Sequence, residues 1–332
     1  MNKDFLNFES NNYKENVSPE QLDSEEREMN KIVDEYIQHP DCKSYIENFK
    51  TIKPICEEVL KQRHPEIKET EWSRNIGIND AIKYAHQFLT TVDSTLADQF
   101  MNLVYQNNNN QKTLNILSQY IKPYCEKGKA YIYYHDKIEN MITLLHEMIH
   151  AMNYSSETTG RTYGQLYISE VPTHIIENLL GKWLVKNKLI TQNDYNIHKK
   201  WRLEHSKKVS CGVLIEKELI DMKLKKGLYI TRPRVIGAIE RKCHIKDPKN
   251  FSEEESEYCY TDLDGILRNK KLEFEIYQRY VIGQYIADKV ENSENPEKAF
   301  LRFHNFEGNV NLSTDRILRI IKKDYQQEDI DR

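Results

Sequence analysis

The sequence lacks any stretch that could cross a membrane. No run in it approaches the roughly 20 consecutive apolar residues that a spanning helix needs. The N-terminal stretch MNKDFLNFESNNYKENVSPE has no apolar run either, so we expect no signal peptide. These absences predict a cytoplasmic protein that does not bind membranes, although secretion without a signal peptide would leave no mark in the sequence.

An excess of positive charge is also missing. The chain contains 48 lysines and arginines against 52 aspartates and glutamates, and its formal net charge is −4. Proteins that bind nucleic acids gain much of their affinity from basic patches that neutralise phosphates. We therefore expect no nucleic-acid partner.

Cysteines are few and are not arranged in pairs. The six cysteines lie at positions 42, 56, 125, 211, 243 and 259, and no C-x-x-C spacing occurs among them. In a chain of 332 residues this pattern is typical of reduced thiols in a cytosolic protein rather than of a disulfide framework.

Glycine and proline are scarce too, with 11 and 9 residues, and long amphipathic stretches dominate the sequence. Apolar residues at helical spacing predict a mostly α protein. The aromatic and β-branched stretch KAYIYYH at 129–135 is the one clear strand signal, and it adds a small β element. We expect helices at 24–39, 42–63, 79–105, 137–153, 166–187, 192–206, 211–225, 259–269, 271–291, 296–304 and 313–325.

The helix expected at 137–153 contains the motif H-E-x-x-H. Residues four apart lie one turn above each other on a helix, so His146 and His150 can face one metal ion. Glu147 lies about 100° round the helix, where it can reach a water on the metal without being a ligand. A random chain of this composition would contain the motif about 3% of the time, so apolar neighbours such as Leu145 and Ile149 add weight. The alternative is a buried core helix that happens to contain two histidines.

A catalytic zinc needs a third protein ligand and an open position for water. The next helix pattern, ISEVPTHIIENLL, would form a hairpin with the motif helix and bring its own side chains across the two histidines. By spacing alone, Glu170 and His174 remain equally good third ligands. The candidates downstream of the motif are Glu157, which falls in a loop, and Glu170, His174 and Glu177.

The stretch AYIYYHDKIENMITLLHEMIHAMNY, followed by LYISEVPTHIIENLL, resembles the catalytic core of the thimet oligopeptidase and oligoendopeptidase F family. That family has a strand, then T-L-x-H-E-x-G-H-A, and then F-V-E-x-P-S-x-x-x-E-N. The resemblance implies a zincin-like metallopeptidase core in which Glu170 is the third zinc ligand. It also implies that Glu177 is a carboxylate that orients a ligating histidine.

The resemblance covers about 125–305 and has two departures. Ile149 stands where the family has a glycine, and Asn153 stands where it has a further histidine. Neither departure removes a metal ligand or the base. We accordingly divide the chain into a mobile polar tail at 1–22, a helical N-terminal region at 23–122 and a zinc metallopeptidase catalytic region at 123–332.

A later stretch, FEIYQRYVIGQYIADKV at 274–290, resembles the family's tyrosine-rich helix with its Y-x-x-G. The family's tyrosines donate to the oxyanion of the tetrahedral intermediate. Tyr280 fits best by its spacing to Gly283, and Tyr277 is next. The alternative is an aromatic stripe that only packs in the core.

Taken together, the motifs predict a zinc-dependent peptidase with one Zn²⁺ and a peptide substrate. Glu147 would act as general base on a zinc-activated water. KAYIYY is expected to be an edge strand that pairs with an extended peptide. Two other functions remain open: a zinc-binding module that binds peptides or proteins without cleaving them, and a specialised effector-type protease with one protein target.

Overall fold

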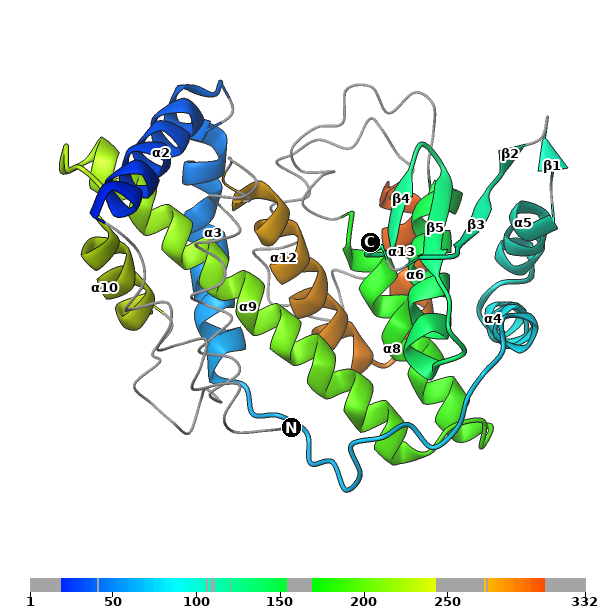
Figure 1. Cartoon of the computed structure of the whole chain (residues 1–332). Coiled ribbons are helices and arrows are strands. Elements are labelled where there is room, and N and C mark those ends of the chain that lie inside the picture. The colour runs from blue at the N-terminus through cyan, green and yellow to red at the C-terminus, as the bar shows by residue number, and fades with distance from the viewer. Residues whose placement is uncertain are drawn as a thin grey trace. The chain divides into compact units, whose positions relative to one another are not determined.

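The computed structural model describes residues 19–40, 42–105, 107–108, 111–119, 121–153, 169–242, 272 and 274–307. The described chain is mostly helical, as predicted (Figure 1). The predicted tail lies outside the described residues except at 19–22, which begin the first described helix. The helices predicted at 259–269 and 313–325, as well as Glu157, also lie outside them. No described helix is long and apolar enough to cross a bilayer.

The chain forms two compact units, each made of two segments. Unit 1 comprises 1–61 and 207–277, and unit 2 comprises 62–206 and 278–332. The described helices of unit 1 are α2 (Pro19–Gln38), α3 (Cys42–Lys61), the second part of α9 (Gln192–Leu224) and α10 (Arg232–Lys242). Asn30 of α2 donates to the carbonyl oxygen of Ile230 at 2.8 Å and accepts from its N–H at 2.9 Å. This pair of bonds ties α2 to the segment before α10.

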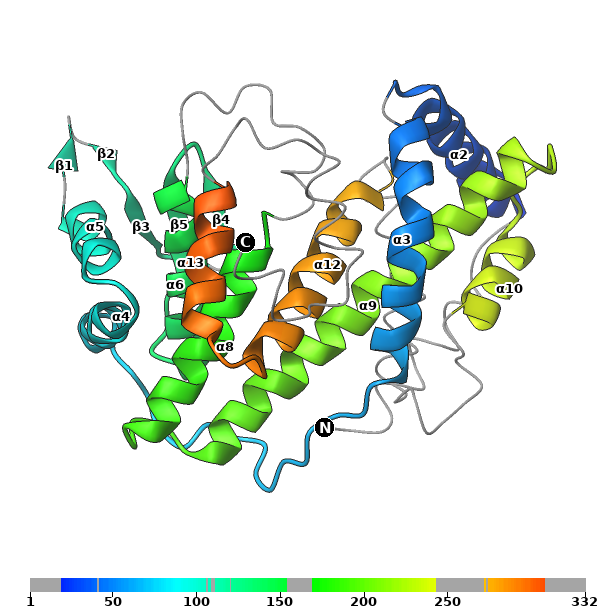
Figure 2. The same ribbon diagram turned by 180° about the vertical axis from the view of Figure 1, so that it is seen from behind.

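Unit 2 contains all the predicted metal ligands. Its helices are α4 (Ile78–Val92), α5 (Ser94–Tyr105), α6 (Ile138–Asn153), α8 (Val171–Lys186), the first part of α9, most of α12 (Phe274–Glu291) and α13 (Pro296–Glu307). Helix α6 packs on the sheet through one face and on α8 through another. Helices α4 and α5 also pack on α6, and α13 packs on α8 (Figure 2).

The sheet of unit 2 has three strands, in the order β3 (Leu114–Leu117), β5 (Lys129–Tyr133), β4 (Tyr124–Glu126). Strand β3 runs parallel to β5, with Leu114 opposite Ala130, whereas β4 is antiparallel to it. Lys127 and Gly128 join β4 to β5 with φ values of 49° and 73°, the left-handed pair that a two-residue hairpin turn requires. A separate short pair joins β1 (Asn107–Asn108) to β2 (Gln111–Lys112).

The prediction that KAYIYY is an edge strand was wrong. This stretch forms β5, which is hydrogen-bonded on both sides and is therefore the central strand. The neighbours that flank it come from stretches with weak strand signals, which the sequence pattern did not reveal. The peptide-accessible edge of this sheet, within the described residues, belongs to β3 or β4.

Candidate metal centre

Helix α6 carries the motif residues and is buried around almost its whole circumference. His146 and Glu147 are 8% and 7% exposed, and the apolar residues of the helix are all buried as well. The helix covers 138–153 and so agrees with the prediction at 137–153. The sheet packs on one side of α6 and α8 on another, and His146 meets the Glu170 and Glu177 carboxylates from the α8 side.

Glu170 is held at the start of α8, facing the motif. It is the residue directly before the helix, and its carbonyl oxygen accepts bonds from the His174 N–H at 3.1 Å and from Thr173 Oγ1 at 2.8 Å. Pro172 in the first turn suits a helix start, because its missing N–H would have no intrahelical partner there. These local features fix the backbone of Glu170, and the packing of α8 on α6 brings its carboxylate to the histidines.

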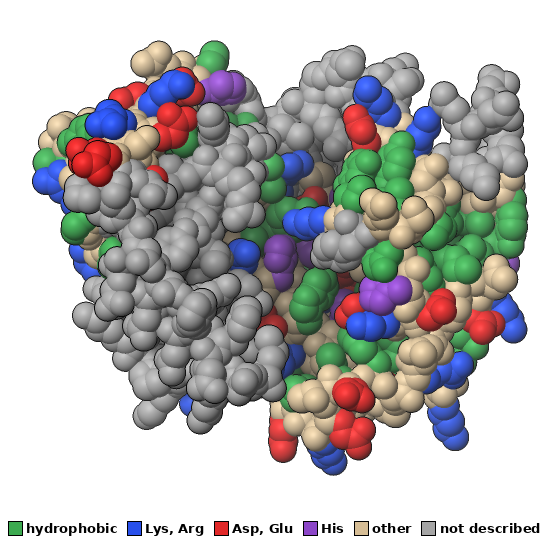
Figure 3. Space-filling model, viewed as in Figure 1, with side chains coloured by type: hydrophobic (Ala, Val, Ile, Leu, Met, Phe, Trp, Pro, Cys, Tyr) green, Lys and Arg blue, Asp and Glu red, His purple; other side chains and the backbone are tan. Residues whose placement is uncertain are grey.

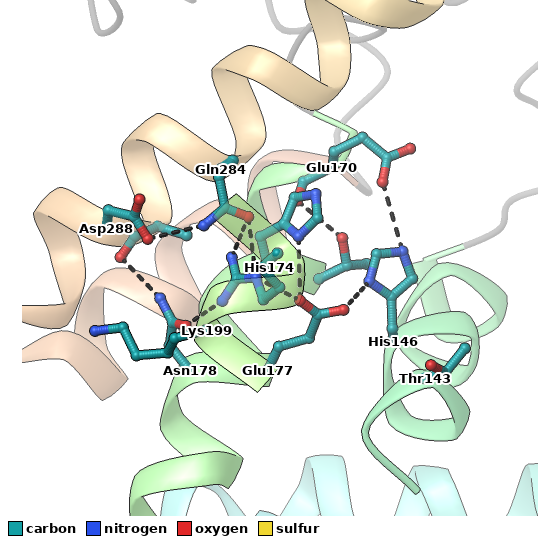
Figure 4. A network of polar contacts seen from close by, with 12 residues as sticks. Thr143, His146, Glu170, His174, Glu177, Asn178, Lys199, Gln284 and Asp288 are labelled. Atoms are coloured by element: carbon teal, nitrogen blue, oxygen red, sulfur yellow. Dashed lines mark hydrogen bonds and ion pairs between the residues drawn. The ribbon is translucent and has the colours of Figure 1, made fainter. Parts of the chain in front are cut away.

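The carboxylate of Glu170 is equidistant from the two motif histidines. Its Oε2 lies 3.5 Å from His146 Nε2 (Figure 4) and 3.5 Å from His150 Nε2. Both separations exceed the usual hydrogen-bond range of about 2.7–3.2 Å. Zinc–nitrogen and zinc–oxygen bonds of about 2.0–2.1 Å in a tetrahedron would place neighbouring ligand atoms about 3.3 Å apart. Each of these two histidine–carboxylate separations is therefore closer to the spacing of two zinc ligands than to that of a hydrogen bond.

The same oxygen of Glu170 is a buried acceptor without a hydrogen bond among the described residues. Its contacts there are the two long ion pairs to His146 and His150, and a metal ion between the three atoms would replace them with direct bonds. The three ligand atoms all lie within 4.8 Å of one another. Two imidazoles and one carboxylate, with a further position open for water, are a donor set that suits a catalytic zinc.

The charges of the cluster favour the binding of a cation. Burial alone would lower the pKa of His146, but the carboxylates of Glu177 and Glu170 outweigh it and raise this pKa to about 9. Burial raises the pKa of Glu147, and the neighbouring histidines offset only part of that rise. Three buried carboxylates around these rings favour bound positive charge, which a metal ion would supply in place of protons.

Glu177 lies behind His146, about two helical turns beyond Glu170. Its Oε1 is 2.8 Å from His146 Nδ1, and its Oε2 is 3.2 Å from His174 Nδ1, so the carboxylate bridges the two rings (Figure 4). The resemblance predicted a carboxylate at this position that orients a ligating histidine, and the structure brings the two side chains together.

A second set of possible ligands overlaps the first and consists of His146, His174 and Glu177. Within it, the 2.8 Å separation of His146 and Glu177 is an ordinary hydrogen bond. His174 Nδ1 is also engaged with Glu177, whereas its Nε2 is buried without a hydrogen-bond partner in the described chain. The geometry thus favours Glu170 over His174 as the third ligand.

Tyr280 approaches the cluster from α12. Its ring centroid lies 6.2 Å from that of His174 and 5.4 Å from that of His205, and Lys122 Nζ lies 5.8 Å from the Tyr280 ring centroid. The charge of Glu170 is the main cause of a raised Tyr280 pKa, with burial second, so the phenol keeps its proton. Tyr277 is half-buried and belongs to unit 1, and the structure does not place it relative to the cluster.

The two departures from the family pattern both lie inside the core. Ile149 is fully buried and Asn153 is 6% exposed. Ile149 occupies space in the packing around α6, where a glycine would let a neighbouring element come closer.

Several site residues escaped the sequence-based prediction. Arg202, His198 and His205 lie on α9, and Gln284 lies on α12. Arg202 pairs with Glu177 and donates to Gln284, and the charge of Glu177 acts on the His198 ring. The His205 ring packs against Tyr280. Helix α9 has no recognisable motif, so only the fold brings these residues to the site. The one available signal was the density of histidines at positions 198 and 205, which follows no ligand spacing.

Comparisons with known proteins do not identify a family. No protein-family model matches this sequence, and no curated protein or solved structure matches it. The resemblance to the thimet oligopeptidase family therefore stays a prediction that rests on the residues quoted above.

Proposed function

We propose that this chain is a zinc-dependent metallopeptidase with a zincin-like core, in which His146, His150 and Glu170 hold the metal. The observation that carries the proposal is the position of Glu170 Oε2, 3.5 Å from both histidine Nε2 atoms and buried without a hydrogen bond in the described chain. The resemblance to a peptidase family supplies the reaction class.

When bound, zinc would lower the pKa of a coordinated water and polarise the scissile carbonyl. Glu147 is the base of the reaction in this proposal. It neighbours His146 on the same helix, and burial raises its pKa toward the range useful for moving protons near neutral pH. It accepts the proton of the attacking water and then delivers it to the leaving amine.

Tyr280 is the donor to the carbonyl oxygen in this proposal. The phenol is protonated and lies on the side of the cluster bounded by His174 and His205. A hydroxyl aimed at the developing negative charge stabilises the transition state more than the bound substrate. Tyr277 remains the alternative donor.

The peptide substrate would pair with the sheet at β4 rather than at β5. In the described residues β4 has β5 as its only neighbour, so its outer edge retains unpaired backbone groups. Tyr124 on β4 is 39% exposed and stacks on Tyr131 with ring centroids 4.7 Å apart. Figure 3 shows hydrophobic side chains gathered on this face over β4 and β5.

The experiment compares the wild-type protein with Glu147→Gln in metal content and in the digestion of a peptide mixture, followed by mass spectrometry. We expect stoichiometric zinc in both proteins and a loss of cleavage of about 10²- to 10⁴-fold in the variant. Equal cleavage by the two proteins would contradict the role of Glu147.

The same experiment separates the two other functions. Stoichiometric zinc without cleavage of any peptide by the wild-type protein would favour a zinc-binding module. Cleavage confined to one protein target, with the peptide mixture untouched, would favour the effector-type protease.

A further inference from the structure

We propose that Arg202 is a positioning residue for the metal centre. Its guanidinium group holds Glu177 in place, and Glu177 in turn holds the Nδ1–H of His146, so that Nε2 of the same ring points at Glu170. The inference rests on the proposed metal centre and extends it to α9, a helix that carries neither sequence motif.

Arg202 is almost completely buried and fully engaged. It is 4% exposed, and its Nε forms an ion pair of 3.1 Å with Glu177 Oε2. Its Nε and Nη2 donate to Gln284 Oε1 at 2.9 and 2.6 Å, and its Nη1 donates to Asn178 Oδ1. A buried guanidinium is retained only where acceptors compensate for lost water, and here they lie on two other helices, α8 and α12.

Glu177 is held by two hydrogen bonds and one ion pair, from side chains on α6, α8 and α9. Oε1 accepts from His146 Nδ1 at 2.8 Å, and Oε2 accepts from His174 Nδ1 at 3.2 Å. The Arg202 guanidinium, whose Nε–H donates to Gln284, pairs with the same Oε2 through its charge. An ionised carboxylate can only accept hydrogen bonds, so the proton of this contact sits on His146 Nδ1. The lone pair on Nε2 is then the one available to a metal, and it faces Glu170 at 3.5 Å.

Without Arg202, Glu177 would lose its one permanently charged partner among the described residues. Its carboxylate could then rotate toward other donors or be protonated, and in either state it would hold the His146 ring less firmly. Lysine cannot substitute fully. Its single ammonium nitrogen cannot contact the acceptors on α8 and α12 at the same time, as the planar guanidinium group does. The role therefore depends on the shape of the guanidinium group as well as on its charge.

The test measures zinc affinity by competition with a chromophoric chelator, using the full-length protein at constant pH. We expect Arg202→Met to weaken zinc binding by about 10- to 100-fold, the range found when partners of ligating histidines are removed, and Arg202→Lys to recover only part of it. Lys199→Met is the matched control. Lys199 lies on the same helix and pairs with Glu291 at 3.2 Å, away from Glu177, so its loss should leave zinc affinity unchanged.

A double-variant comparison distinguishes a positioning role from a general effect on folding. If Arg202 acts through Glu177, then Arg202→Met should add little further loss of affinity in a Glu177→Gln background. Losses that multiply in the double variant would contradict the proposal. If Arg202→Met does not fold, the same comparison with Arg202→Lys decides, and wild-type affinity in that variant would overturn the requirement for the guanidinium group.

A second readout does not depend on metal or on catalysis. In the metal-free protein the His146 Nδ1–H should give a downfield proton resonance that is protected from exchange by Glu177, and Arg202→Met or Arg202→Lys should lose that protection. An unchanged resonance would contradict the proposal. Failure of the wild-type protein to bind zinc would instead contradict the proposed function, while this resonance would still report on the role of Arg202.

Discussion

Gly283 of α12 lies directly against Glu170 at the start of α8. A Cβ atom built on Gly283 would come within 2.7 Å of Glu170 Cβ and 2.9 Å of His174 Cδ2. No real Cβ contact is this short, and the opposing atoms belong to the base of one buried side chain and the ring of another. The glycine of the Y-x-x-G stretch thus permits the close approach of α12 to the candidate metal centre.

Gly283→Ala should therefore displace Glu170 and weaken zinc binding. Overpacking of a well-packed core typically costs about 1–3 kcal/mol. We expect part of this cost to lower the free energy of unfolding and the rest to lower the affinity for zinc. The measurements are zinc affinity and the free energy of unfolding. Gly237→Ala is the control, because its new Cβ would meet mainly the mobile end of Arg241 at 3.0 Å. Equal effects of the two substitutions on zinc affinity would contradict the prediction.

Substitution of the two candidate third ligands should separate them. Glu170→Ala removes the oxygen that lies between the two histidine Nε2 atoms, so stoichiometric zinc should be lost. His174→Ala leaves that oxygen in place and should retain zinc. Elemental analysis of the purified variants measures both. The reverse result would make His174 the ligand and the second set, with Glu177, the metal site.

Tyr280→Phe should leave zinc bound but slow peptide cleavage. Loss of one donor to a developing oxyanion typically lowers kcat by about 10²- to 10³-fold with a small change in KM. Tyr277→Phe is the matched control and should retain most of the activity. A large fall in kcat for Tyr277→Phe, with Tyr280→Phe unaffected, would transfer the role to Tyr277.

Because His198 is buried, we expect the protein to lose stability in acid. His198 is 2% exposed, and neither of its ring nitrogens has a hydrogen-bond partner in the described chain. Burial lowers its pKa to about 3, with Glu177 offsetting only part of the effect. In the unfolded chain this histidine has a pKa of about 6.5, so on acidification it binds a proton while His198 in the folded chain is still neutral.

The stabilisation from neutral His198 is complete above about pH 6.5 and is lost as the pH falls toward 3. Between these pH values, the uptake of one proton on unfolding lowers the free energy of unfolding by about 1.4 kcal/mol for each pH unit of acidification. Denaturant unfolding of the wild type and of His198→Phe, at pH 7 and pH 5, measures the difference. The variant should lose less stability on acidification, and parallel pH profiles would argue against a neutral buried His198.

Some helix boundaries were predictable because their signals are local. Helix α6 follows from the apolar residues of 138–153, and α2 ends at Gln38, one residue before the predicted end at 39. The predicted helix at 79–105 instead breaks at Asp93, whose backbone is extended and whose Oδ1 accepts the Leu96 N–H at 2.9 Å. An aspartate that caps the next helix is a local signal, and the apolar periodicity on either side of it concealed the break.

Other elements depended on tertiary packing. The two helices predicted at 192–206 and 211–225 are one continuous helix, α9, in which even Lys207 is buried at 1% exposure. Helix α10 was missed because Pro233 and Gly237 resemble loop residues, although Pro233 sits in the permissive first turn. Both helices nevertheless bury apolar side chains, such as Val209 and Leu219 of α9 and Ala238 and Ile239 of α10.

The same distinction holds within the candidate site. The four-residue spacing of His146 and His150 determines their common direction wherever that segment is helical, and the three-residue spacing of His174 and Glu177 does the same on α8. The sequence alone therefore determined the motif and the common direction of its two histidines. It left Glu170 and His174 undecided by spacing, because the choice depends on how α8 crosses α6.

Only the tertiary structure decided which distant residues join that motif. Arg202 lies 25 positions after Glu177, and Gly283 lies more than 100 positions after Glu170, yet both contact these residues across helix interfaces. Neither relation has a spacing that a helix or a strand would impose. Each follows from how closely the buried faces of α8, α9 and α12 pack, which is a property of the whole core rather than of any one segment.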